Sequence, residues 1–468
     1  LALQLAVLLL PFRQLSTYSL LSAVMIIYLV NKRTNPDFKL TWIIPIAVLP
    51  VFGALFYLFF KIQPGQYLVR RRSKRLARQR LMGSVAPPDG LFRYLSRLGF
   101  PVYDDSMVTY YPMGDTLLEQ MIASLEEARK FIFVQYFIVA EGQIWDRVRD
   151  VLERKAAQGV EVRLMMDGLG ILGRLPEDIC QQMEAKGIAC RIFSPIRPIP
   201  SVLQNNRLHR KILVVDGRVA FTGGINLADE YINAYEKHGH WKDTAVMVKG
   251  EAARSFTRMF LHMWYLDEKA PDFDTFLNVP AKQQAANGFV MPYGDCPLDK
   301  DKVGEQVYMD MLNRAQKYVH IMTPYLILDG ELENALKYAA ERGVDVRIIL
   351  PGVPDKYIPF ALALTHYRSL LESGVKIYEY TPGFVHAKVF VCDDREAVVG
   401  TINLDYRSLY HHFECATYLW GTDCIPQIQD DFEKTQGKCR EVTLDLLPAE
   451  PLKRRLLGFI AKAAAPLL

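Results

Sequence analysis

A duplicated motif constrains this chain more than any other feature of its sequence. Residues 209–216 and 386–393 both read H-x-K-x-x-x-x-D, and in both copies six further residues lead to a Gly-[Gly/Thr]-Ile-Asn-Leu segment. The two copies match without a gap, which chance does not explain. The chain therefore contains an internal repeat, and each copy carries the same small set of polar residues.

Other segments recur in the same order before each motif. Residues 159–166 and 343–350 both begin Gly-Val-[Glu/Asp]-Val-Arg, continue with apolar residues, and follow a helical stretch that contains Ala-Ala. A glycine between such stretches predicts a helix end followed by a buried strand. We expect an α/β fold in which two tandem repeats form a pseudo-twofold catalytic unit.

The apolar run after each lysine predicts a strand. Side chains two residues apart on a strand project from the same face, so His209 is expected beside Lys211, and His386 beside Lys388. Each run ends in a turn-forming pair, Asp-Gly or Asp-Asp, after which a return strand is expected. Two such half-sites, facing each other, would surround one anionic centre.

These groups suit attack on a phosphodiester. Lysine cations can stabilise the charge that builds on non-bridging oxygens, and no metal is then needed. One neutral imidazole can attack phosphorus while the other, protonated, donates its proton to the leaving alkoxide. The expected catalytic residues are His209, Lys211, Asp216, His386, Lys388 and Asp393.

Three more residues are expected to contact the substrate, namely Asn226, Asn403 and Glu414. Each imidazole also needs an acceptor for its other nitrogen, and Asp216, Asp393 and Glu414 are all candidates. The sequence does not say which acid serves which histidine. The segment at residues 241–243, Trp-Lys-Asp, could line the site or could pack and cap.

The paired motifs resemble those of the phospholipase D superfamily, and the whole chain is similar to its bacterial cardiolipin synthases. The flanking segments that carry this second resemblance are residues 35–45, 136–138, 167–170, 241–243 and 403–408. The resemblance implies two phospholipase D-like α/β repeats that condense two phosphatidylglycerol molecules into cardiolipin and glycerol through a phosphohistidine. It implies no cofactor, with His209 as the nucleophile and His386 as the general acid.

Three other functions remain open from the same motifs. A phospholipase D would transfer the phosphatidyl group to water and yield phosphatidic acid. A nuclease would need an extended basic groove, which a net charge of only +4 does not indicate, so no nucleic-acid partner is expected. A scaffold with a dead site is disfavoured because both histidine and lysine pairs are complete. The oligomeric state is left open.

The N-terminal sixty residues are strongly apolar and predict transmembrane helices. Residues 40–60 carry no charge and are long enough for one span, residues 15–30 suggest a second, and residues 1–12 a possible truncated third. Basic residues crowd positions 61–80, which favours a multi-pass protein of the bacterial plasma membrane with a cytoplasmic catalytic part and contacts to anionic lipids. Basic residues at 32–39 weigh against this orientation.

These features predict six segments: a transmembrane region at 1–62, a basic linker at 63–100, the first repeat at 101–266, a second linker at 267–287, the second repeat at 288–448 and an amphipathic tail at 449–468. The tail could lie on a membrane or dock on the protein.

Neither cysteines nor the remaining histidines indicate a metal site. The seven cysteines form no C-x-x-C pair, so neither a disulfide framework nor a zinc site is expected, and reduced thiols fit best. His262, His320 and His366 are expected to be packed side chains. The close pairs at 238–240 and 411–412 lack a carboxylate or cysteine at metal-ligand spacing.

Overall fold

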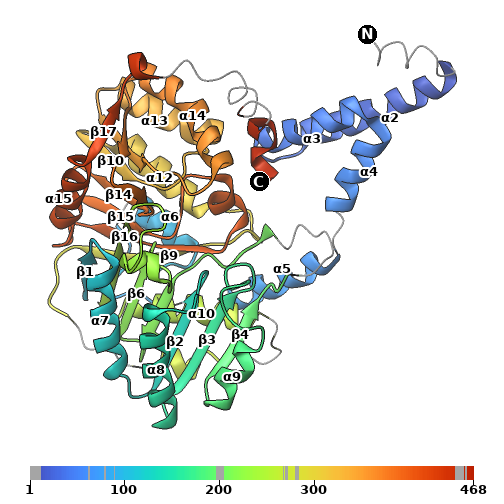
Figure 1. Ribbon diagram of the computed structural model, residues 1–468. Coiled ribbons are helices and arrows are strands. Elements are labelled where there is room, and N and C mark those ends of the chain that lie inside the picture. The colour runs from blue at the N-terminus through green and yellow to red at the C-terminus, as the bar shows by residue number, and fades with distance from the viewer. Residues whose placement is uncertain are drawn as a thin grey trace.

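The computed structural model describes residues 12–61, 64–77, 81–88, 90–196, 205–266, 268, 272–279, 284–447, 458 and 461–467 (Figure 1). Nearly all of the possible third span at residues 1–12, as well as Arg78 and Arg80 of the basic run, lie outside the described residues. The same holds for most of the tail before residue 461.

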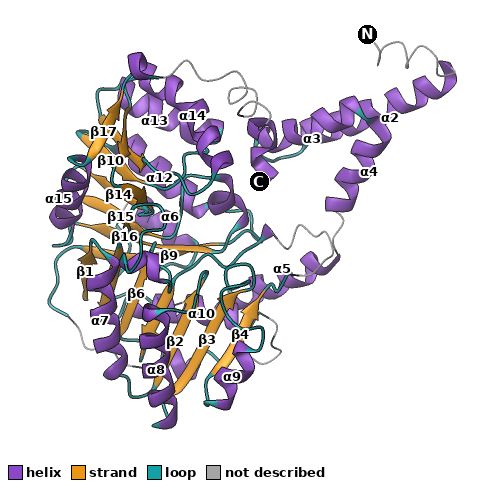
Figure 2. Cartoon of the chain, in the orientation of Figure 1, coloured by secondary structure: helices purple, strands orange, loops and turns teal. Residues whose placement is uncertain are grey.

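Two mixed sheets form the body of the protein (Figure 2). The first is ordered β1 (Ser106–Tyr111), β8 (Ala245–Gly250), β6 (Val219–Gly223), β5 (Ile212–Val215), β2 (Phe131–Tyr136), β3 (Glu161–Asp167) and β4 (Ala189–Phe193). The second is ordered β9 (Phe289–Asp295), β16 (Glu414–Trp420), β15 (Glu396–Gly400), β14 (Val389–Cys392), β10 (Tyr318–Met322), β11 (Asp345–Pro351), β12 (Lys376–Tyr380) and β17 (Cys439–Val442). Strand by strand, the first seven positions correspond, which confirms the α/β fold and the duplication.

Helices cover both faces of each sheet. The outer face of the first sheet carries α7 (Gly114–Glu126), α8 (Gln143–Ala157) and α9 (Ile179–Ala185), and that of the second carries α12 (Val303–Arg314), α13 (Gly330–Glu341) and α14 (Tyr357–Glu372). On the inner side, α10 (Ala253–Trp264) and α15 (Ile425–Gln436) enclose a core built from both repeats. Gly159 and Gly343 follow α8 and α13 with φ of +87° and +91°, so the predicted glycine helix ends are confirmed.

The strands that carry the duplicated motif are β5 and β14, each paired antiparallel with a return strand, β6 or β15. Asp216 and Gly217 have φ of 52° and 65°, and Asp393 and Asp394 have φ of 54° and 57°. Positive φ at both central residues matches a tight hairpin turn. The predicted turns and return strands are confirmed.

The aspartates at these turns stabilise the fold by binding backbone N–H groups; their carboxylates do not orient the histidines. The carboxylate of Asp216 accepts the backbone N–H groups of residues 129, 130 and 131, and that of Asp393 accepts those of residues 316, 317 and 318. Seven residues separate His209 from Asp216 along an extended strand, a span of roughly 20 Å. The prediction that these aspartates belong to the catalytic centre is wrong.

The N-terminal region consists of four helices: α2 (Phe12–Asn31), α3 (Pro36–Val48), α4 (Pro50–Lys61) and α5 (Pro64–Leu76). The predicted single helix over residues 40–60 is wrong, because it breaks at Leu49, which has φ −131° and ψ 78°. Pro50 disfavours helical geometry at the residue before it. Gly53 lets α4 approach α3 closely, since a Cβ there would lie 2.6 Å from the Pro45 carbonyl oxygen.

Within the described part of the chain, no helix has both the length and the apolar character needed to cross a bilayer. Helix α3 begins against the second repeat, α2 and α4 project from the body, and α5 returns alongside the first repeat (Figure 1). Ser73 of α5 lies against α10, with its Oγ 3.2 Å from His262 Nε2. The basic segment is therefore anchored to the catalytic part.

Two further expectations meet the structure. Cys180 and Cys190 form a disulfide that ties α9 to β4, so the expectation of reduced thiols is wrong for this pair. The described end of the tail docks on the protein: Ala461 and Ala465 are buried, and the Thr41 hydroxyl donates to the Ala463 carbonyl over 3.0 Å.

Replacing Asp216 with alanine should destabilise the fold without removing a catalytic group. Three backbone N–H groups lose a charged acceptor, so the free energy of unfolding should fall by about 3 kcal/mol. Urea unfolding of Asp216→Ala beside the exposed control Asp178→Ala measures this change. Unchanged stability together with a large loss of kcat would instead return Asp216 to the catalytic centre.

Candidate active site

Two short parallel backbone contacts between the repeats place the histidines. Strand β7 (His240–Lys242) pairs with β13 (Gly383–Val385), and Leu208 bridges to Phe413. Just beyond these contacts, the His386 N–H donates to the Lys242 carbonyl over 2.7 Å, and the His209 N–H donates to the Phe413 carbonyl over 3.0 Å. Each histidine therefore lies close to the residue that comes directly after its hydrogen-bond acceptor in the other repeat, residue 243 for His386 and residue 414 for His209.

That residue is an acid in both cases. His209 Nδ1 lies 2.8 and 2.9 Å from the two carboxylate oxygens of Glu414, and His386 Nδ1 lies 2.6 Å from Asp243 Oδ2. The exchange is reciprocal, because Glu414 belongs to the second repeat and Asp243 to the first. With Nδ1 engaged, each imidazole keeps Nε2 for a substrate.

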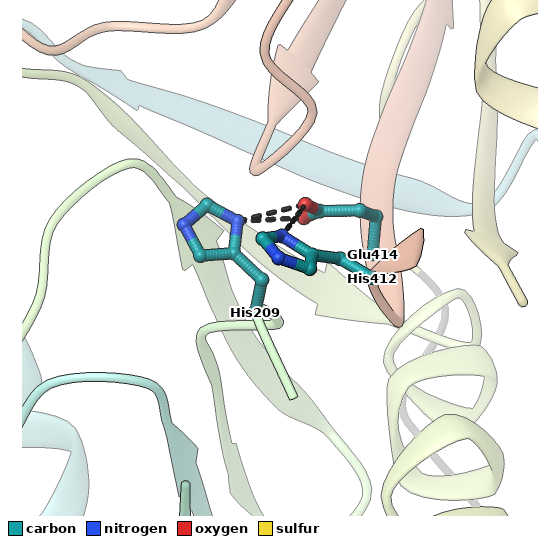
Figure 3. A group of neighbouring side chains, drawn as sticks. All are labelled: His209, His412 and Glu414. Atoms are coloured by element: carbon teal, nitrogen blue, oxygen red, sulfur yellow. Dashed lines mark hydrogen bonds and ion pairs between the residues drawn. The ribbon is translucent and has the colours of Figure 1, made fainter. Parts of the chain in front are cut away.

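A third histidine, His412, borders the first pair; sequence spacing indicates no carboxylate partner for the 411–412 pair, but Glu414 supplies one. His412 Nδ1 lies 3.4 Å from Glu414 Oε1, and its ring centroid is 5.3 Å from that of His209 (Figure 3). Potential ligand atoms of these three residues lie within 4.8 Å of one another, so they could hold a metal ion. The Glu414 oxygens already accept from His209 and from the Thr401 hydroxyl, and a metal would compete with both.

The two lysines of the motif are buried beside the histidines. Lys211 Nζ donates to the His209 carbonyl over 2.7 Å, and Lys388 Nζ donates to the His386 carbonyl. Burial lowers the pKa of Lys211 to about 8, against the opposing effect of Glu414. Burial, together with the nearby Lys211 charge, lowers the pKa of Lys388 to about 7, although Asp243 opposes the shift.

The two half-sites differ in the protonation of their acids. Burial alone would raise the pKa of Glu414, but the adjacent His209 and His412 outweigh it and hold that pKa well below its usual value. Burial raises the pKa of Asp243 to about 7. Burial also lowers the pKa of both His209 and His386 well below the ordinary 6.5. Glu414 is therefore ionised at neutral pH, whereas Asp243 titrates there.

The residue before each Ile-Asn segment accommodates the acid. In the second repeat the Thr401 hydroxyl donates to Glu414. In the first repeat the equivalent residue is Gly224, where any Cβ would collide with the Asp243 carboxylate. The single difference between the duplicated segments, Gly against Thr, therefore matches the different acids.

Aromatic rings wall both histidines. The Phe137 ring centroid is 5.1 Å from that of His209, and those of Tyr231 and Trp241 are 5.4 and 5.5 Å from that of His386. Asn226 holds this wall: its Oδ1 accepts the N–H of residue 138 over 3.0 Å, and its Nδ2 donates to the Tyr231 hydroxyl over 2.7 Å.

Four of the predicted catalytic residues, His209, Lys211, His386 and Lys388, lie around one centre, since the charge of Lys211 acts on both histidines and that of Lys388 on His386. Glu414 is fully buried, and its carboxylate binds His209 Nδ1, the acceptor position for which it was one of three candidates. Asn403 is buried, and its Oδ1 has no hydrogen-bond partner among the described residues. Asp243, which the sequence left undecided, proves to be the partner of His386.

Comparisons with known proteins agree with this geometry. A family model described as "Cardiolipin synthase, PLD-like domain" matches residues 121–264 and 308–436, and one described as "Phospholipase_D-nuclease N-terminal" matches residues 20–61. A solved phosphatidylserine synthase of Haemophilus influenzae has a TM-score of 0.61 at 18% identity, with 77% of this chain and 95% of that chain covered. The fold and site thus define a phospholipase D-like protein.

Sequence relatives narrow this class. The chain is 32% identical to the cardiolipin synthase of Alkalihalophilus pseudofirmus, with 97% of this chain and 93% of that protein covered. It is 50% identical to an uncharacterized protein of Streptococcus mutans, with 95% and 99% covered. The chain belongs to the cardiolipin synthase family of phospholipase D-like proteins.

Replacing Glu414 with glutamine should slow catalysis while keeping the side-chain volume. The imidazole of His209 would lose its anionic partner, and kcat should fall on the order of a hundredfold or more. Glu333→Gln is the matched control, because Glu333 contacts His366 over 2.7 Å outside the site. Equal kcat in the two variants would contradict the role assigned to Glu414.

Proposed function

We propose that this chain is a cardiolipin synthase, a phosphatidyltransferase that joins two phosphatidylglycerol molecules and releases glycerol. The observation that carries the proposal is the pair of buried imidazoles, each bound through Nδ1 to the acid of the other repeat. A two-step transfer needs one nucleophile and one proton donor at the same phosphorus, and two such imidazoles supply both.

In the first step, His209 Nε2 attacks the phosphorus of one phosphatidylglycerol. The bond to the head-group glycerol oxygen breaks, and His386 gives its Nε2 proton to that oxygen as glycerol leaves, while the proton of Asp243 moves to Nδ1. The ionised Glu414 stabilises the positive charge that forms on the His209 ring. Lys211 and Lys388 offset the charge that gathers on the non-bridging oxygens. The product of this step is a phosphatidyl-histidine.

In the second step, a head-group hydroxyl of another phosphatidylglycerol attacks the phosphorus. His386 Nε2, which no longer carries a proton, takes the hydroxyl proton, and the bond between phosphorus and His209 Nε2 breaks. Cardiolipin leaves and both histidines return to their first state. Asp243 supports this division of roles, because its pKa of about 7 lets it share a proton with His386 near neutral pH.

The main alternative is hydrolysis by the same residues. Transfer to water would yield phosphatidic acid, and only the exclusion of water separates the two outcomes. His209 and His386 are 6% and 7% exposed, and aromatic rings flank both. These features favour transfer to a lipid hydroxyl.

We also propose that helices α2 to α4 associate with the bacterial plasma membrane. They expose large apolar side chains such as Leu20, Ile27, Phe52, Leu55 and Phe59. The described basic residues of α5 are suited to anionic lipid head groups and favour a cytoplasmic catalytic part. The Cys180–Cys190 disulfide removes the support that reduced thiols would have given to that orientation.

Product analysis tests the proposed reaction. The purified full chain, incubated with phosphatidylglycerol vesicles, should yield cardiolipin and glycerol by mass spectrometry. His209→Ala and His386→Ala should each reduce the rate roughly a thousandfold or more, since each removes a reacting group. His262→Gln, outside the site, is the control and should stay within about twofold. Phosphatidic acid as the dominant wild-type product would support the hydrolase instead.

A burst experiment separates the two histidines. Bis(4-nitrophenyl) phosphate has a leaving group that needs no proton donor, so its first step depends only on the nucleophile. His386→Ala should therefore release about one nitrophenolate per site and then stall as a phosphohistidine, whereas His209→Ala should give no burst. A burst from His209→Ala and none from His386→Ala would reverse the assignment.

The lysines predict a decline in activity at alkaline pH. Their lowered pKa values, about 7 for Lys388 and about 8 for Lys211, mean that both cations are lost as pH rises through this range. kcat/KM should fall over the same range, and kcat should fall at higher pH because bound phosphate favours charged lysine. A kcat/KM that stays constant to about pH 10, where ordinary lysines titrate, would contradict this.

A further inference from the structure

A cavity of about 380 Å³ lies beside the second half-site. Its apolar lining includes Ile358 and Leu362 of α14 and Ala465 of the tail. Its polar lining includes the cations of Lys356 and Arg407 and the carboxylate of Asp405. The end of the tail lies against α3 (Figure 1), so the cavity lies near the N-terminal helices.

Two aromatic rings connect the cavity with His386. Tyr325 lines the cavity, and its ring centroid is 6.4 Å from that of Phe384. The ring centroids of Phe384 and His386 are 5.9 Å apart. After burial, Lys388 and Lys211, the charge of Lys356 also lowers the pKa of His386. The cavity is therefore electrostatically coupled to the catalytic centre.

One apolar residue of the lining is exposed to solvent. Ile358 is 46% exposed, and Tyr357, next to it in the sequence, is 53% exposed. An exposed apolar side chain in a cavity lining suits a ligand whose hydrophobic part extends beyond the cavity. A volume near the lower end of the range for ligand sites, ~300–1,000 Å³, holds a head group and the start of a chain, but not two whole acyl chains.

We propose that this cavity binds the acceptor phosphatidylglycerol of the second step, an inference that rests on the proposed function. Lys356 and Arg407 hold the acceptor's phosphodiester, and Asp405 accepts hydrogen bonds from its glycerol hydroxyls. The head-group glycerol then extends to the phosphohistidine, where His386 takes the proton of the attacking hydroxyl. The acyl chains leave past Ile358.

The charges fit this occupant better than they fit water alone or an unbranched fatty acid. Two cations and one carboxylate line the cavity, and a lysine with an arginine suits a phosphodiester monoanion. Asp355, outside that lining, contacts Lys356 Nζ over 3.8 Å and accepts from the Tyr325 hydroxyl over 2.7 Å, so a bound phosphodiester competes with it for the lysine. A hydroxyl-bearing head group uses Asp405, whereas a fatty acid would not.

The ratio of phosphatidic acid to cardiolipin tests this site. Without a bound acceptor lipid, water hydrolyses the phosphohistidine and forms phosphatidic acid, so the ratio should rise. With full-length protein and dioleoyl phosphatidylglycerol vesicles, Ile358→Asp and Lys356→Ala should each raise the ratio about tenfold or more, which corresponds to 1.4 kcal/mol. Leu446→Asp, an equally apolar residue that is 61% exposed and does not line the cavity, is the control.

Nitrophenolate release from bis(4-nitrophenyl) phosphate, measured in the same preparations, reports the histidine chemistry without a lipid acceptor. An unchanged product ratio in both variants would overturn the acceptor site while leaving the synthase reaction intact. Equal losses of nitrophenolate release and cardiolipin formation would overturn it as well, because they would indicate damage to the histidines. Wild-type protein that forms no cardiolipin would instead defeat the proposed function itself.

Discussion

The reciprocal exchange of acids between the repeats is the interaction on which the rest of this structure depends. Each imidazole is held by a carboxylate that arrives from the other half of the chain, Glu414 for His209 and Asp243 for His386. Neither repeat therefore contains a finished half-site. The parallel contacts just before these residues, together with the core shared by both sheets, fix the two repeats in one orientation. The site therefore forms only when the two repeats are docked on each other.

Duplication made the site symmetric, and small differences make it directional. An ionised glutamate backs one histidine and an aspartate with a raised pKa of about 7 backs the other. A nucleophile benefits from a permanent anion behind it, whereas a group that gives and regains a proton benefits from a partner that titrates near neutral pH. The exchange of Gly224 for Thr401 between the repeats fits each acid into its place.

The sequence predicts the duplicated core well because its signals are local. Residues two apart on a strand share a face, so the His-Lys pairs were predictable, as were the hairpin turns and the glycine helix ends. Glu414 was one of three candidate acceptors, but the pairing of acids with histidines was not predictable, because Glu414 and Asp243 lie 205 and 143 residues from their histidines. The catalytic role predicted for Asp216 has the same origin. Its position in the motif is a local signal, but its carboxylate accepts backbone N–H groups at the far end of the strand. The break at Leu49 could have been read from Pro50.

Nitrogen-15 NMR of histidine-labelled protein near pH 8 tests the reciprocal exchange most directly. The account predicts that His209 and His386 both carry their proton on Nδ1, since each Nδ1 faces a carboxylate. Glu414→Gln should then shift the ring signals of His209 and leave those of His386 nearly unchanged, and Asp243→Asn should do the opposite. Signals of the Nε2-protonated form at both histidines, or a shift of His386 alone in Glu414→Gln, would contradict it.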